Sequence, residues 1–249
     1  MVVSGYQEKE GSSLTPFYNL ITTKTTHLKQ SVHPWSKTHN NKLASRVYNT
    51  ERILNAATAL HLISTRTTIP VPRLLSSDTN PDGNAWLETE RTPNGLWLDV
   101  VRDRCRMPAG KQHVAEGSEC DECDRIARAN ARRFVTDEVL PQLNGLRSDV
   151  TGLGGRVIPP LWVTFHEEEP GWVPKRVEEG VEGYVFCHGN LHAHSILVHA
   201  ETLHVLQIVD WEEAGYFPKE FQVWSVTREE YEALYEDEEH RKRLTALMV

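Results

Sequence analysis

The residues whose types and spacing could do chemistry lie together in the stretch 184–224. Within it, a polar turn that contains His188, Asn190 and Ser195 joins two short apolar runs, and Asp210 ends the apolar run that follows. A carboxylate at the end of one strand, beside a polar loop from a neighbouring strand, is suited to hold a divalent cation on a nucleotide. The spacing therefore predicts a metal site at Asp210, with a functional loop that ends near Ser195.

The letters of this stretch resemble a known family. Residues 188–192 read His-Gly-Asn-Leu-His, residues 196–198 read Ile-Leu-Val, and residues 208–215 read Ile-Val-Asp-Trp-Glu-Glu-Ala-Gly. This order resembles the aminoglycoside phosphotransferase-like family. Its members have a protein-kinase-like fold and transfer the terminal phosphoryl group of a nucleoside triphosphate to small molecules.

The resemblance implies a fold class and a set of ligands. It covers roughly residues 45–225, including the segment 67–72 and the hinge-like segment 87–95. We expect an α+β, protein-kinase-like two-lobed fold with a reduced N-terminal lobe. Because the chain ends about 40 residues after Asp210, the helical C-terminal lobe is expected to be truncated. ATP and magnesium are the implied cofactors, and a hydroxyl group of a small molecule is the implied acceptor.

Carried over residue by residue, the resemblance makes Asp210 a magnesium ligand and places Ser195 where the family has its second metal ligand, an asparagine. Asn190 stands where the family has its catalytic aspartate, and His188 opens the same loop. An amide can orient a hydroxyl but cannot accept its proton, and general-base assistance is typically worth about 10²–10⁴-fold. We expect weak phosphotransferase activity; the alternative is a catalytically inactive pseudokinase that acts as a binding module.

The small lobe also departs from the family. Loops that cradle phosphates use glycines so that backbone N–H groups can approach the ligand, yet residues 12–82 contain no glycine. The nucleotide loop is therefore expected to be absent or unconventional. Spacing assigns the phosphate-gripping lysine to Lys42, with Glu51 of the next helix as its partner. Glu90 is placed in the hinge that would meet adenine.

Each residue of the C-terminal motif also has a plainer interpretation. His188 could tie its loop to the metal strand by hydrogen bonds instead of carrying a proton. Asn190 could be a turn residue whose side chain bonds local backbone. Asp210 could be a surface carboxylate beside a turn, although its place in the motif favours the metal site.

Two other groups raise the question of zinc. Histidines at 188, 192, 194 and 199, with His204 nearby, offer ligands at short spacing, but the helical H-E-x-x-H pattern is missing and the family motif already accounts for the first of them. Cys120 and Cys123 form a lone C-x-x-C without a second pair. That spacing favours an exposed helix start over a metal or redox site.

The elements around these residues follow from hydrophobic spacing. We expect helices over 43–63 and 121–146, a surface loop over 107–120, and a final helix that a Thr227–Glu230 capping box begins. Short strands are expected over 17–22, 85–90, 184–187, 196–198 and 203–209. This pattern divides the chain into a poorly ordered segment 1–42, a remnant small lobe and hinge over 43–95, and a large lobe over 96–249.

Composition excludes several classes of protein. The net charge of -8 argues against a nucleic-acid partner, which requires a basic surface. No stretch is apolar over the roughly 18 residues that a membrane span requires, and the N-terminus lacks a signal-peptide pattern, so we expect a cytoplasmic protein without a membrane partner. Four cysteines are too few for a disulfide scaffold. The oligomeric state does not follow from the sequence.

Overall fold

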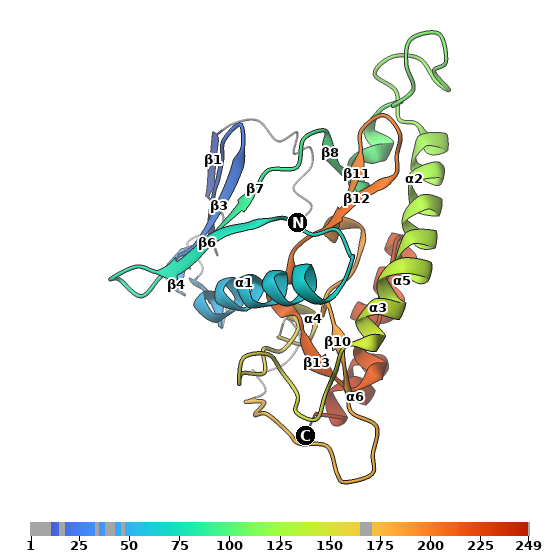
Figure 1. Ribbon diagram of the computed structural model, residues 1–249. Coiled ribbons are helices and arrows are strands. Elements are labelled where there is room, and N and C mark those ends of the chain that lie inside the picture. Colours follow the sequence, from blue (N-terminus) through green and yellow to red (C-terminus); the bar gives the residue numbers. More distant parts are fainter. Residues whose placement is uncertain are drawn as a thin grey trace.

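The computed structural model describes residues 11–14, 18–32, 35–37, 43–45, 48–164 and 171–248. The chain has a two-lobed α+β architecture, which confirms the predicted fold class: an antiparallel sheet and one helix form the small lobe, and shorter sheets with the remaining helices form the large lobe. In Figure 1 the long helix α1 crosses between the small-lobe sheet and the large lobe.

The small lobe is a five-stranded sheet in the order β1-β2-β3-β7-β6, with each neighbouring pair antiparallel. Its strands are β1 (Gly11–Leu14), β2 (Tyr18–Thr22), β3 (Thr26–Ser31), β6 (Leu74–Thr79) and β7 (Ala85–Glu90). The apolar face of α1 packs against this sheet through buried residues that include Ile53, Ala56 and Leu60. This packing sets the distance between the sheet and the large lobe.

The segment up to residue 42 corrects the sequence analysis, which expected poor order and one short strand over 17–22. Its described residues supply β1, β2 and β3, and β3 lies inside the sheet between β2 and β7. Backbone hydrogen bonds hold such a strand, and the threonines of this segment favour extended backbone. Because most of these side chains are only half-buried, the segment lacks the strong apolar alternation that would have marked its strands.

Helix α1 covers Asn49–Arg66, whereas the hydrophobic spacing predicted 43–63. Tyr48 adopts a left-handed backbone conformation with φ of 56° and so cannot continue a right-handed helix toward the N-terminus. Leu43–Ser45 instead forms β5, which pairs with β4 (Trp35–Lys37). The helix ends before Thr67, whose backbone is extended and leads toward Pro70.

The large lobe contains two three-stranded sheets that surround the motif. One has the order β12-β11-β8 and the other β13-β10-β9. Their strands are β8 (Gly95–Trp97), β9 (Arg147–Ser148), β10 (Tyr184–Cys187), β11 (Ile196–His199), β12 (Val205–Ile208) and β13 (Gly215–Phe217). Short 3-10 helices over Leu98–Asp103, Ala193–Ser195, Trp211–Glu213 and Lys219–Phe221 join or follow these strands. The strands predicted within 184–209 are confirmed, with the third shortened to β12.

The predicted helix over 121–146 is confirmed in three consecutive parts. They are α2 (Asp121–Phe134), a π-helical turn (Val135–Val139) and α3 (Leu140–Gly145). Pro141 stands at the start of α3, where its missing N–H and its ring are incompatible with an ordinary helical bond to the preceding turn. The π-helical turn widens the helix just before the proline, which lets the rod continue.

The remaining helices are α4 (Leu161–Thr164), α5 (Arg228–Tyr231), which runs into a π-helical turn (Glu232–Glu236), and α6 (Glu238–Ala246). The predicted capping box is present at α5: the Thr227 hydroxyl accepts from the Glu230 N–H at 3.2 Å, and the Glu230 carboxylate accepts from the Thr227 N–H at 3.4 Å. None of the described helices is both long enough and apolar enough to cross a membrane.

Glu230 also joins this cap to α2, and we predict that Glu230→Gln lowers the free energy of unfolding at pH 7 by about 1–2 kcal/mol. Its carboxylate accepts from the Val226 N–H at 2.9 Å and meets the Arg132 guanidinium at 2.5 Å. Burial raises the pKa of Glu230, but these hydrogen bonds and the Arg132 charge outweigh it, and the net pKa lies below the usual value of 4.5.

A carboxyl group whose pKa is lower in the folded state than in the unfolded state stabilises the fold fully above the unfolded-state pKa. This stabilisation is lost as the pH falls through the folded-state pKa. We therefore expect the difference in the free energy of unfolding between wild type and Glu230→Gln, measured by urea denaturation from pH 7 to pH 3, to shrink below about pH 4.5. Glu236→Gln, which alters an exposed carboxylate outside the cap, is the control. A difference in the free energy of unfolding that stays constant over this pH range would show that the Glu230 carboxylate does not stabilise the cap through its charge.

Candidate functional site

The loop between β10 and β11 holds the end of β12 through the backbone of a single residue. The Val209 N–H donates to the Ser195 carbonyl at 2.9 Å, and the Val209 carbonyl lies 2.8 Å from His188 Nε2. Both hydrogen-bonding groups of Val209 are therefore used by the loop. Asp210 follows Val209 directly, so the loop determines where its carboxylate lies.

His188 acts through these bonds as a neutral side chain. Burial lowers its pKa to about 4, so the ring carries no charge near neutral pH. Nε2 then carries the hydrogen for the Val209 carbonyl, which leaves Nδ1 to accept the Asn190 N–H at 3.3 Å. The ring also packs on Trp211, with centroids 4.5 Å apart. This geometry favours the interpretation of His188 as a residue that ties the loop to the metal strand.

Gly189 is required where this loop meets the segment after Asp210. Its φ is +87°, and a Cβ added there would lie 2.4 Å from the Glu213 carbonyl oxygen, closer than atoms can approach. The Gly189 carbonyl in turn accepts from the Trp162 indole N–H at 2.8 Å. A glycine at this position allows the two loops to touch backbone to backbone.

Asp210 lies at the junction of β12 and the 3-10 helix over 211–213. Its backbone is left-handed, with φ of 62°, a conformation that aspartate tolerates better than most residues. The Trp211 indole donates to the Ile208 carbonyl at 2.9 Å and so holds the turn from its other side. The Asp210 side chain is 52% exposed, which leaves its carboxylate accessible to a ligand.

A lysine from the small lobe faces this carboxylate. Lys29 Nζ lies 3.6 Å from an Asp210 oxygen, forms an ion pair with the buried Glu212, and sits 4.2 Å from the centroid of the Tyr18 ring. Lys29 is in β3, opposite Leu20 of β2 and Leu87 of β7. The strand register therefore turns one face of three strands toward Asp210.

Lys29 was not singled out from the sequence. Spacing assigned the phosphate-gripping lysine to Lys42, which lies outside the described residues, so that assignment stays a prediction. Glu51, its assigned partner, is in the first turn of α1, and no ion pair between it and a lysine occurs within the described part of the chain. The sequence carries one weak sign of the strand that holds Lys29, because the threonines before it favour extended backbone.

A cavity runs between the lobes beside Lys29 and Asp210. Its walls come from all three of the small-lobe strands just named, from α1 and from the β11–β12 region. The lining residues are Tyr18, Leu20, His27, Lys29, Ala56, Leu60, Pro72, Leu87, Thr89, Glu90, Thr92, Trp97, Leu197, Gln207, Val209, Asp210, Trp211 and Glu212. Most of the interior is apolar, which suits a flat apolar ligand part. Lys29, Asp210 and Glu212 gather at one end, and because the two carboxylates outnumber the lysine, an anionic part of a ligand would need a metal cation there.

Glu90, which the sequence analysis placed in the hinge, lines this cavity at the end of β7. Its carboxylate accepts from Arg73 Nε at 2.7 Å, and this bond, followed by the Arg73 charge, lowers the pKa of Glu90 below its usual value. The Glu90 side chain is thus paired with Arg73 and half exposed. What Glu90 contributes to a bound ligand stays a prediction.

The two altered motif positions differ in their surroundings. The Ser195 hydroxyl accepts from the His192 N–H at 2.9 Å and lies 2.8 Å from the His192 carbonyl, so it is occupied within its own loop. Direct metal ligation by Ser195, which stays a prediction, would require breaking these bonds. Asn190 Oδ1, by contrast, is buried and lacks a hydrogen-bond partner among the described residues. A buried acceptor without a partner is costly, and a ligand hydroxyl is one group that could pair with it.

The other histidines of the loop have local partners. His192 Nδ1 accepts from the His194 N–H at 3.4 Å, and burial, together with the neighbouring His194 and His188, lowers the pKa of His192 to about 3. His194 pairs with Asp99 at 2.8 Å, and that hydrogen bond raises its pKa. In the part of the chain that the structure describes, these rings form no group with metal-ligating geometry.

Helix α1 fastens the small lobe to the segment that carries Asp210. Arg52, which is 1% exposed, lies 3.4 Å from a carboxylate oxygen of Glu213, which is 4% exposed, and it donates to the Pro159 carbonyl at 2.7 Å. Asn55 donates to the carbonyls of Glu212 and Ala214 at 3.0 and 2.8 Å. These contacts bracket the turn that presents Asp210.

No protein-family model and no curated protein matches the sequence. Solved structures do resemble the chain. One is a GDP complex of a mutant aminoglycoside 2′-phosphotransferase-IIIa, with 12% identity over 99% of this chain and 77% of that one and a TM-score of 0.49. Another is an aminoglycoside-3′-phosphotransferase of type VIII, with 16% identity over 100% of this chain and 91% of that one and a TM-score of 0.44.

A third similar structure is the GDP and kanamycin complex of APH(2″)-IIIa, with 12% identity over 98% of this chain and 78% of that one and a TM-score of 0.40. All three are aminoglycoside phosphotransferases, the family that the motif over 188–215 resembles. Because the identities and TM-scores are low, what the site does has to be argued from this chain's own residues.

The buried pair of Arg52 and Glu213 generates a prediction. Arg52→Met leaves an uncompensated buried carboxylate and should lower the free energy of unfolding by about 3–5 kcal/mol. Glu213→Gln should cost a similar amount. In the double variant neither charge remains to be desolvated, so the combined loss should be well below the sum of the two single losses. Denaturant titration of the four proteins measures the coupling, and additive losses would show that the two charges are independent.

Proposed function

We propose that the chain binds a nucleoside triphosphate with magnesium between its lobes and transfers the terminal phosphoryl group slowly to a hydroxyl of a small molecule. The observation that carries this proposal is the meeting of Lys29 and Asp210, 3.6 Å apart, at the mouth of an apolar cavity. A cation for the phosphates and a carboxylate for a metal ion are the two ionic groups that phosphoryl transfer requires of a protein.

The cavity supports the nucleotide part of the proposal. Leu20, Leu87 and Leu197 belong to its walls from both lobes, and such walls accommodate a planar base. Glu90 and Thr92 border the segment that connects β7 to β8, where backbone groups could meet the edge of the base. Since residues 12–82 lack glycine, the phosphates would depend on Lys29 and the metal ion more than on backbone N–H groups.

Asp210 fits magnesium, because this ion commonly binds through one or two carboxylates, substrate phosphates and retained water. Its exposed carboxylate provides one hard oxygen ligand beside the site of Lys29. Ser195 would contribute through a water molecule, since its hydroxyl is engaged with His192. When bound, the ion would neutralise charge on the phosphates during transfer.

Asn190 sets the rate in this proposal. Its unpartnered Oδ1 can accept a hydrogen bond from the acceptor hydroxyl and so orient it, but an amide takes no proton. His188 is neutral, yet Nδ1 and Nε2 are both committed to backbone groups. Positioning and electrostatics would therefore act without a general base, which predicts slow turnover.

The second candidate function is a binding module without turnover, a pseudokinase. It is favoured by the state of Lys29, which is already paired with Glu212 and Asp210. A nucleotide would have to compete with these carboxylates for the lysine. The two candidates differ in whether any phosphoryl transfer occurs once a nucleotide is bound.

The binding step is tested by thermal shift with ATP and magnesium together. We expect stabilisation of the wild type that is largely lost in Lys29→Met and Asp210→Asn, because each removes an ionic partner of the phosphates or the metal ion. Lys24→Met, which removes an exposed lysine in the turn between β2 and β3, should behave as the wild type. If none of these proteins is stabilised by ATP with magnesium, both candidate functions that involve a nucleotide fail.

The transfer step is tested by Asn190→Asp, which restores a carboxylate at the base position. We expect phosphate transfer to rise by about 10²–10⁴-fold, measured with radiolabelled ATP and a panel of hydroxylated cationic small molecules that includes aminoglycosides. The net charge of -8 favours cationic acceptors in that panel. Asn144→Asp, at an exposed position in α3, is the control.

The outcomes separate the candidates. Transfer by the wild type that Asn190→Asp accelerates supports the slow phosphotransferase. Nucleotide binding without transfer or hydrolysis in either protein supports the binding module.

A further inference from the structure

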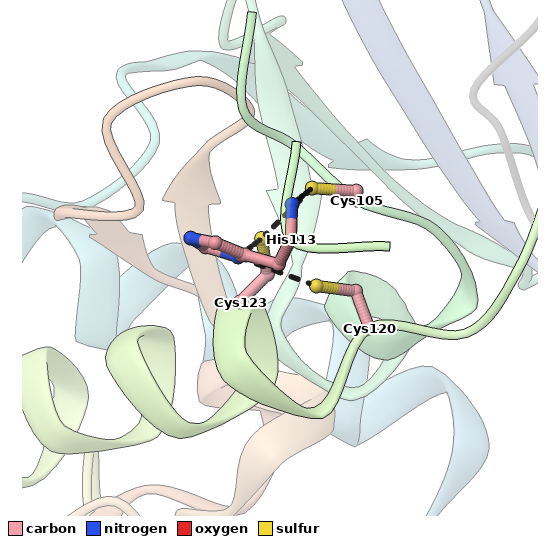
Figure 2. Close-up of side chains that lie close together, drawn as sticks. All are labelled: Cys105, His113, Cys120 and Cys123. Carbon is pink, nitrogen blue, oxygen red and sulfur yellow. Dashed lines mark hydrogen bonds between the residues drawn. The ribbon is translucent and has the colours of Figure 1, made fainter. Parts of the chain in front are cut away.

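A cluster of three cysteines and one histidine lies outside the candidate site. Cys105 follows the 3-10 helix over 98–103, His113 lies in the long loop after it, Cys120 precedes α2, and Cys123 is in the first turn of α2. Figure 2 shows the four side chains converging from these segments. Their ligand atoms, three sulfurs and one imidazole nitrogen, all lie within 4.8 Å of one another.

The distances match a tetrahedral site. Zinc binds sulfur at about 2.3 Å and imidazole nitrogen at about 2.0–2.1 Å, which places two sulfurs about 3.8 Å apart and a sulfur and a nitrogen about 3.6 Å apart. The Cys105 and Cys123 sulfurs are 3.9 Å apart. His113 Nδ1 lies 3.5 Å from the sulfur of Cys120 and 3.5 Å from that of Cys123. These three separations are those expected around one zinc ion, and the other pairs of ligand atoms lie within 4.8 Å of one another.

Backbone donors support thiolate sulfur at two of the corners. The Arg106 N–H points at the Cys123 sulfur, and the His113 N–H points at the Cys105 sulfur, each at 3.3 Å. Such bonds offset negative charge on a ligating sulfur and orient it toward the metal ion. All four cysteines of the chain are free thiols.

Few side chains of the loop over 104–119 hold it to the large lobe: Arg106 donates to the Val100 carbonyl at 2.7 Å, and Cys105, Met107 and Val114 pack against the core. Residues 108–119 are exposed except for the half-buried Val114, and the loop contains no helix or strand. Ordering each residue costs about 1–2 kcal/mol of backbone entropy, so a loop with this little apolar contact requires a cross-link. In Figure 1 it projects beyond the N-terminal end of α2.

We propose that Cys105, His113, Cys120 and Cys123 bind one zinc ion that cross-links this loop to α2. Three thiolates and one imidazole fill a tetrahedral shell, so the site is structural and leaves no position open for substrate. Soft sulfur ligands select zinc over magnesium or calcium. Cys120 and Cys123 are completely buried at the edge of the main core, which anchors the ion to the body of the large lobe.

This assignment corrects the hypothesis that Cys120 and Cys123 are a lone pair at an exposed helix start. The missing half of the site is a cysteine and a histidine contributed by the loop before the helix, not a second C-x-x-C. Both residues of the pair are buried, with 0% exposure each. The site shares no residue with the cavity of the proposed nucleotide site.

The zinc content of the purified chain tests the proposal. Protein prepared under reducing conditions without chelator should contain about one zinc ion per chain by inductively coupled plasma mass spectrometry. His113→Ala is the first variant, because His113 is exposed and its removal deletes a ligand without opening the core. Its zinc content should fall sharply after passage over a weak chelating resin. His61→Ala, at an exposed position of α1, should keep the full content.

The cysteines are tested in the same way. Cys105→Ser and Cys123→Ser should lose zinc, whereas Cys187→Ser, which alters the buried cysteine of β10 outside the cluster, should retain it. Cobalt substitution adds an absorption spectrum that reports on metal ligation directly, and replacing a cysteine that does not bind the metal ion would leave that spectrum unchanged. The cobalt form should show thiolate charge-transfer and tetrahedral d–d bands, and each ligand variant should change them.

Three results would overturn the proposal. The first is reduced protein that binds neither zinc nor cobalt. The second is equal zinc loss in Cys187→Ser or His61→Ala, which would place the ion elsewhere. The third is a disulfide within the cluster, identified by mass spectrometry, that reduction opens without creating zinc binding.

Discussion

The rest of the structure depends on the polar contacts between α1 and the turn after Asp210. Arg52 and Glu213 are charges removed from water, and each is tolerable only because the other, together with the Pro159 carbonyl, compensates for its lost hydration. Asn55 adds hydrogen bonds to two carbonyls of the same turn. Since the small-lobe sheet packs on α1, this junction sets the distance between Lys29 and Asp210, and so the geometry of the cavity.

The groups that hold Asp210 in place differ from the side chains that would act on a ligand. Asp210 is held through the backbone of Val209 and through contact between Gly189 and Glu213. The side chains of Asn190 and Ser195 take no part in those contacts to the Asp210 strand. A change of the Asn190 side chain would therefore leave these contacts intact, whereas the Ser195 hydroxyl also closes its own loop through His192. Position 190 could therefore vary without loss of the architecture around Asp210.

The parts of the fold that sequence could predict are those specified by neighbouring residues. The strands over 184–209 and the Thr227–Glu230 cap were predicted correctly because alternation and capping are local. Lys29 was not singled out because its place beside Asp210 depends on the pairing of β3 with β7, which is distant in sequence, and because threonine-rich strands carry a weak apolar pattern. The start of α1 was misplaced for a related reason, since nothing in the hydrophobic spacing reveals the left-handed turn at Tyr48.

The cysteine cluster also could not be predicted from neighbouring residues. Ligand spacing is readable only when both halves of a site use familiar short intervals, and here Cys105 and His113 reach the C-x-x-C through a long exposed loop. That loop continues the 3-10 helix over 98–103, and Asp99 of that helix bonds His194 in the loop that holds Asp210. A cross-link at Cys105 would therefore limit motion at both ends of one short segment. Order in the exposed loop and order beside the candidate site then have a common physical cause, a fixed 3-10 helix between them.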